Sequence, residues 1–135
     1  MSAAERIAAF LQLAHEELTA ARNLSTSGRR QAAYFCQQSA EKIAPAILAH
    51  AGVLFSTGHN LGQMAAALPP DHPWRDKLNA LDKHSPAATR YRYPGPTGRL
   101  AEPPSVERLE EDIRELSTLL DEARLFTRSG GGPRP

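Results

Sequence analysis

VERLEEDIRELSTLLDEA, residues 106–123, is the stretch that decides the fold class of this 135-residue chain. Its apolar residues recur at alternating intervals of three and four without a break, at Val106, Leu109, Ile113, Leu116, Leu120 and Ala123. This spacing puts all six on one face of an α-helix, with a seam like that of a coiled coil. We therefore expect a long amphipathic helix that packs against other helices.

Two more long helices are expected before this one. The first should cover residues 3–24, because Ser2 and Glu5 have capping-box spacing and the following apolar residues recur on one helical face. The second should begin after a short polar turn and end near Gly52, since glycine suits the left-handed position after a helix. Pro45 lies inside this second helix, where its missing N–H predicts a kink.

Two short helices and a loop should follow in the middle of the chain. Asn60 can cap the first short helix, with Gln63 at the capping-box position. Pro73 suits the first turn of the second, which should stop before Pro86. Residues 91–104 are rich in proline and glycine and are expected to form a loop with fixed turns.

The expected fold is all-α, an antiparallel up-and-down bundle of about five helices, three long and two short. The composition agrees, because 41% of the residues are hydrophobic and only 6% aromatic. A chain of 14.7 kDa suits one hydrophobic core, so residues 1–127 are assigned to one domain and residues 128–135 to a disordered tail. A homodimer through a face that includes the second or last helix is also expected.

The composition argues against several classes of protein. The single Cys36 cannot form an internal disulfide, and its neighbours indicate a small buried side chain. The first twenty residues are too charged for a signal peptide, and no apolar stretch approaches the roughly 20 residues of a membrane span. We therefore expect a cytoplasmic protein. Metal-ligand spacings and Gly-rich phosphate loops are missing, so no cofactor is predicted.

Charge is distributed unevenly along the chain. The net charge is only +1, so any binding of nucleic acid must come from local charge. Residues 75–99 contain six basic residues against two acids, a local charge of +4. Residues 105–124 contain seven acids against three arginines, a local charge of −4, and these acids are expected on the solvated face of the last helix.

Three motifs resemble the HEPN family. Residues 33–42, AYFCQQSAEK, resemble the pattern of Ala, Gln, Ala and Glu-Lys on the long second helix of that family. Residues 57–61, TGHNL, resemble its Thr-His-Asp-Leu signature with one inserted glycine and Asn in place of Asp. Residues 88–94, ATRYRYP, resemble its Ala-Arg-Tyr-Pro loop. The resemblance spans about residues 3–127 and implies a helical bundle, a prokaryotic origin, frequent homodimers and often a nucleotidyltransferase partner in a toxin–antitoxin pair.

The ribonuclease members of that family carry an Arg, four to six residues and then a His near the start of the last helix. In this chain no histidine follows Arg90, Arg92 or Arg99. Cleavage of RNA without a metal needs a proton acceptor of near-neutral pKa and a cation for the phosphate, and after His84 only cations remain. A non-catalytic protein is therefore expected, unless a histidine arrives from elsewhere in the fold.

Ligand binding is assigned to the residues that could contact a phosphate or a base, which are Glu41, Lys42, His59, Arg90, Tyr91, Arg92 and Tyr93. The last four alternate cation and ring, which suits phosphate contact with base stacking. They could equally be tyrosines packed on the bundle beside solvated arginines. Lys42 could be solvated while Glu41 pairs internally with an arginine, and His59 could only fix the turn before a helix.

The function we expect is that of a non-catalytic HEPN protein, which binds a nucleotide or RNA through the basic segment and pairs with a nucleotidyltransferase-type protein. One alternative is a metal-independent ribonuclease toxin with a displaced histidine. Another is a structural module for protein interaction with no nucleic-acid role.

Overall fold

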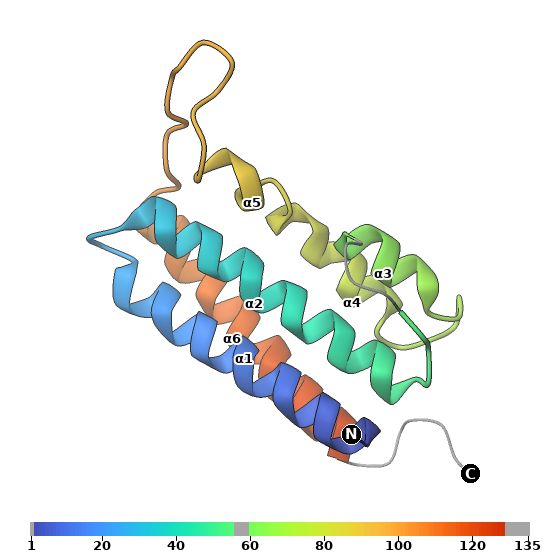
Figure 1. The fold of residues 1–135 in the computed structure, drawn as a ribbon. Helices are drawn as coiled ribbons and strands as arrows, with labels where there is room; N and C mark the ends of the chain where they lie inside the picture. Colours follow the sequence, from blue (N-terminus) through green and yellow to red (C-terminus); the bar gives the residue numbers. More distant parts are fainter. Residues whose placement is uncertain (1, 56–59, 129–135) are drawn as a thin grey trace.

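Three long helices form the centre of the molecule. In the computed structural model, which describes residues 2–55 and 60–128, they are α1 (Ala3–Leu24), α2 (Arg29–His50) and α6 (Val106–Arg128). Each of the three contacts the other two, and they lie side by side in Figure 1. All regular secondary structure in the described residues is helical, which confirms the predicted all-α bundle.

Local sequence signals set the ends of α1 and α2. The Ser2 hydroxyl oxygen accepts a hydrogen bond from the backbone N–H of Glu5 at 3.1 Å and caps α1. The second helix continues through Pro45 as one helix, and the chain leaves it at Gly52. That glycine has a φ of 74°, a left-handed conformation that side chains disfavour.

Short helical elements cross beside α2, namely α3 (Leu61–Ala67), α4 (Arg75–Ala80), the 3₁₀ turn η1 (Leu81–His84) and α5 (Ala87–Arg90). The predicted capping box is present, because the Asn60 side chain accepts from the backbone of Gln63 at 2.7 Å and the Gln63 side chain accepts from the backbone of Asn60 at 2.9 Å. The four-residue α5 was not predicted. It begins directly after Pro86, whose fixed φ favours a helical start.

A loop leads from α5 to α6, and two arginines at the start of α2 hold its end. Arg29 donates a hydrogen bond to the carbonyl of Pro104 at 3.0 Å, and Arg30 donates one to the carbonyl of Ala101 at 3.1 Å. The helix α6 then starts after Ser105 and ends at Arg128, the first residue of the predicted tail. The rest of that tail, residues 129–135, lies outside the described residues.

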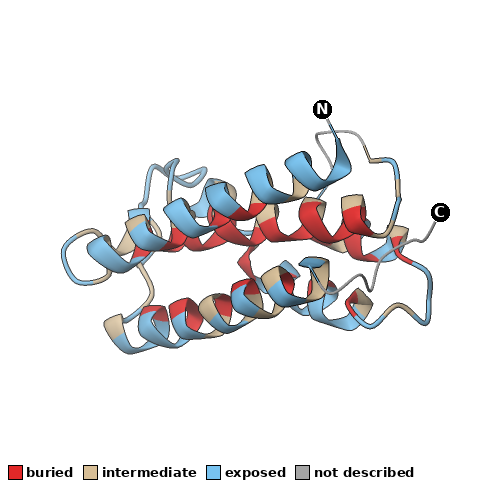
Figure 2. Cartoon of the chain, turned by 90° about the horizontal axis from the view of Figure 1, so that it is seen from below, coloured by how far each residue is buried: buried red, intermediate tan, exposed pale blue. Residues whose placement is uncertain are grey.

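The main core joins α1, α2, α3, α4 and α6, and the buried residues lie on the inward sides of the helices (Figure 2). A smaller apolar cluster of Ala32, Ala33, Ala87 and Leu109 lies where α2, α5 and α6 meet. Among the described helices, none has the length and hydropathy that a membrane crossing requires.

Candidate functional site

A cavity of about 180 Å³ lies where α2, η1, α5 and α6 meet, and we refer to it as the basic cavity. Its charged lining consists of Lys83, Arg90, Arg108 and Asp112, and His84 lies beside them. Small residues of α2 and α5, including Ala33, Cys36 and Ala87, form the remainder of its inner wall. The smaller apolar cluster therefore supports this cavity from behind.

Asp112 is the acidic residue of the basic cavity, and its burial corrects the expectation that every acid of the last helix is solvated. It is 9% exposed, and its carboxylate lies 3.3 Å from Nε of Arg108 and 4.0 Å from Nζ of Lys83. The reason is its position in the helix, three residues after Leu109 and four before Leu116, which places it beside the apolar stripe. That spacing is a signal that could have identified it.

His84 ends η1 and is the histidine that the fold brings to the cavity. The residue is 7% exposed, and its buried Nε2 has no hydrogen-bond partner among the described residues. Burial lowers the pKa of His84, while the Asp112 carboxylate opposes this change. The imidazole is therefore neutral at neutral pH and can accept a hydrogen bond or a proton.

Three cations line the cavity together with this neutral histidine. Lys83, Arg90 and Arg108 share this lining with one carboxylate, that of Asp112, and the ion pair of Lys83 with Glu115 reduces the local excess to one positive charge. Lys83 is also held by Glu115 at 2.8 Å. Arg90 is exposed and makes no ion pair with the described residues, including Glu41. A lining of this kind suits an anion, and the guanidinium groups in particular suit phosphate.

Cys36 lies at the inner wall of the cavity but is not a reactive thiol. Burial raises its pKa to about 12, with a smaller contribution from the charge of Asp112. The predicted role as a small buried side chain is confirmed. Among the described residues, no group of three His, Cys, Asp or Glu side chains is placed to hold a metal ion.

The sequence allows two roles for the segment Arg90–Tyr93, either ligand binding or tyrosines packed on the bundle beside solvated arginines, and its residues differ in which role they fit. Tyr91 is half-buried and packs against the smaller apolar cluster, whereas Tyr93 is 55% exposed. The guanidinium of Arg92 lies over the ring of Tyr34 at 4.9 Å and over the ring of Tyr93 at 5.2 Å. Of these four residues, Arg90 and Tyr91 line the basic cavity, and Arg92 and Tyr93 do not.

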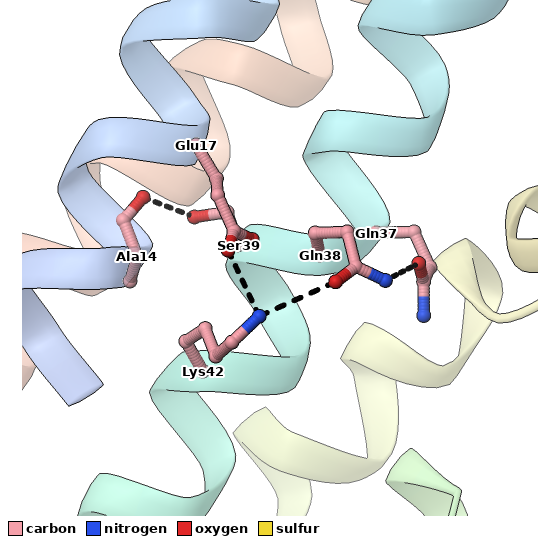
Figure 3. A network of polar contacts seen from close by, with 6 residues as sticks. All are labelled: Ala14, Glu17, Gln37, Gln38, Ser39 and Lys42. Carbon is pink, nitrogen blue, oxygen red and sulfur yellow. Dashed lines mark hydrogen bonds and ion pairs between the residues drawn. The ribbon is translucent and has the colours of Figure 1, made fainter.

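Lys42 and Glu41 lie away from this cavity. Lys42 donates to the carboxylate of Glu17 on α1 at 2.9 Å and to the side chain of Gln38 at 3.3 Å, as Figure 3 shows. Glu41 makes no ion pair with any described residue, so the alternative of a solvated lysine and a paired glutamate is wrong. These contacts join α1 to α2, which gives Lys42 a structural role.

The same network continues through neighbouring residues of α2 (Figure 3). Ser39 donates to the backbone carbonyl of Ala14 at 2.9 Å, and Gln38 donates to the side chain of Gln37 at 2.8 Å. The polar part of the 33–42 motif therefore serves helix packing. His59 and the start of the 57–61 motif lie outside the described residues.

Comparison with protein families identifies the bundle. The family model of the HEPN domain matches residues 7–129, a range that includes every helix from α2 to α6. No curated protein and no solved structure matches the chain. The match confirms the resemblance seen in the three motifs, and the chain belongs to the HEPN domain family.

Proposed function

We propose that this HEPN domain binds the phosphate of a nucleotide or of RNA in the basic cavity, and that it does so without catalysing a reaction. The observation that carries the proposal is the convergence of Lys83, Arg90 and Arg108 on one small cavity. The whole chain has a net charge of only +1, so this concentration of cations is local. A phosphate would compensate the excess positive charge and accept hydrogen bonds from the guanidinium groups.

Arg90 is the cation best placed to contact such a ligand. Arg108 and Lys83 already pair with Asp112, and Lys83 also pairs with Glu115. Arg90 has no ion pair with the described residues, so it can bind an anion without first breaking an interaction. This free guanidinium supports the proposed contribution of Arg90 to ligand binding.

The partner protein belongs to the same proposal. Membership of the HEPN family supports, as an expectation from the resemblance, a homodimer that pairs with a nucleotidyltransferase-type protein in a cytoplasmic toxin–antitoxin system. In such a pair, the nucleotide would lie in the basic cavity of the HEPN domain, and the nucleotidyltransferase-type protein would bind the same domain. The competing hypothesis is that the domain binds only another protein and has no nucleotide or RNA ligand.

Fluorescence anisotropy with AMP analogues and short RNA tests the proposal. Replacing Arg90 by alanine should weaken binding about tenfold, the loss of one charge-assisted hydrogen bond. Stability should change by less than about 0.5 kcal/mol, because the side chain is exposed. The control is Arg114→Ala, because Arg114 is also an exposed arginine but lies on α6, outside the lining of the basic cavity. Absence of binding, or equal effects of the two substitutions, contradicts the proposal.

A second candidate function is cleavage of RNA without a metal, and the position of His84 is the observation that favours it. A neutral histidine beside three cations is the combination that this reaction needs. His84 would take the proton of a 2′-hydroxyl, whose oxygen would bond to the adjacent phosphorus while the bond to the 5′-oxygen breaks. The leaving 5′-oxygen would take a proton from water, and the protonated His84 would return its proton to the solvent. The products would be a 2′,3′-cyclic phosphate and a 5′-hydroxyl.

Incubation of RNA with the protein in the presence of a chelator separates the two candidates. The non-catalytic proposal predicts intact RNA. Cleavage that is lost in His84→Ala but kept in His15→Ala, the exposed control, would establish the nuclease instead. Cleavage lost in His59→Ala alone would place the base at the start of α3.

A further inference from the structure

A second cavity, of about 400 Å³, lies on the loop that follows α5, and we call it the loop cavity. Its lining includes Arg90, Tyr93, Arg99 and Leu100. Arg90 also lines the basic cavity, so the two cavities are neighbours that share one guanidinium side chain. In Figure 1 this loop projects beyond the ends of the long helices.

The loop cavity combines apolar and cationic groups at exposed positions. Tyr93 is 55% exposed and Leu100 is 64% exposed, so both side chains are accessible to a ligand. The loop is nevertheless held in a defined turn, since the backbone N–H of Gly95 donates to the carbonyl of Arg99 at 2.8 Å. The N–H of Gly98 donates to the carbonyl of Gly95 at 2.9 Å. A flat apolar ligand with an anionic group would match this lining.

One face of the Tyr93 ring contacts a cation that also contacts a second ring. The guanidinium of Arg92 lies over the Tyr93 ring at 5.2 Å and over the ring of Tyr34, on α2, at 4.9 Å. One face of Tyr93 is thus occupied, and within the described part of the chain no other ring or cation lies over it. The other face of the ring is therefore open to a stacked base.

We infer that the loop cavity is a nucleobase subsite, and that Arg90 joins it to the phosphate in the basic cavity. The base stacks on Tyr93 and contacts Leu100, while Arg99 offers hydrogen bonds to the edge of the base. The ligand class is a nucleotide, free or within a single strand, in contrast to a simple phosphate or sugar phosphate. This inference rests on the proposed function and adds to it the recognition of a base.

Isothermal titration calorimetry with AMP and with ribose 5-phosphate tests it, because the two ligands differ only in the base. The wild-type protein should bind AMP about tenfold more tightly, the gain that one stacked base supplies. Tyr93→Ala should remove this gain and leave the affinity for ribose 5-phosphate unchanged, whereas Tyr93→Phe should keep it. Leu100→Ala should reduce it, and Leu54→Ala, which changes an exposed leucine after α2, should not.

The outcomes separate this inference from the proposal on which it rests. Equal affinity for both ligands, or AMP binding that Tyr93→Ala leaves unchanged, overturns the base subsite and leaves the phosphate site intact. If neither ligand nor a single-stranded RNA trinucleotide binds, both ideas fall. Binding of the trinucleotide alone, with the same dependence on Tyr93, supports the subsite and identifies RNA as the source of the base.

Discussion

At the scale of single residues, the burial of His84 links the candidate site to the stability of the fold. Burial lowers the pKa of this histidine in the folded chain, with Asp112 opposing the change. In the unfolded chain the imidazole is in water, where its pKa is about 6.5. The unfolded state therefore binds a proton at a pH where the folded state does not, and protonation favours unfolding.

The first prediction is that thermal stability falls as the pH is lowered from about 7.5 to 5.5, through the pKa of the unfolded histidine. The melting temperature, followed by circular dichroism, should depend less on pH in His84→Gln. His72, whose pKa is also lowered by burial, contributes in the same direction, so His72→Gln is the comparison. A pH dependence unchanged in His84→Gln contradicts the assignment.

At the scale of elements, α6 carries an apolar stripe and one wall of the basic cavity on adjacent parts of its surface. Leu109 and Leu116 belong to the stripe, and Asp112 lies between them while pairing with Arg108. A carboxylate at this position loses hydration, so its ion pairs must compensate. Because Arg108 and Lys83 are themselves half-exposed, the compensation is partly screened by solvent.

The second prediction concerns this carboxylate. Asp112→Asn should lower the free energy of unfolding by about 1 kcal/mol, because Arg108 loses its partner next to the core and Lys83 loses one of its two. The neighbouring Glu111 is exposed, and Glu111→Gln should change stability by less than about 0.5 kcal/mol. Urea denaturation measures both. Equal effects of the two substitutions would show that Asp112 has no special environment.

The elements also show which parts of the structure the sequence could predict. The bounds of α1 and the capping box of α3 follow from signals within a few residues, namely Ser2 with Glu5 and Asn60 with Gln63. The four residues of α5 are too few to show a helical period. The meeting of His84 with Asp112 depends on how η1 and α6 pack around α2, which no local pattern encodes.

At the scale of the whole molecule, two exposed leucines bear on the predicted homodimer. Leu13 on α1 is partly exposed, and Leu125 near the end of α6 is 63% exposed. The first part of α1 and the end of α6 lie at the same end of the bundle in Figure 1. A small alanine-rich bundle gains stability when another copy covers such apolar side chains.

The third prediction is a dimer through this region. Multi-angle light scattering at micromolar concentration should give twice the 14.7 kDa of the chain. Leu125→Glu should give a monomer, because a charge at a buried interface loses hydration. Leu54→Glu, at an exposed leucine after α2, should remain dimeric. A wild-type mass equal to that of one chain rules out the dimer.

The central claim is that the basic cavity binds a nucleotide phosphate, and the histidine ring resonances test it most directly. Two-dimensional NMR of the imidazole groups, recorded while AMP is added, reports on each histidine separately. The His84 resonances should shift with saturation, because the phosphate approaches its ring, while those of exposed His15 should stay in place. Saturable shifts confined to other histidines, or no shift at His84 at millimolar AMP, would contradict the claim.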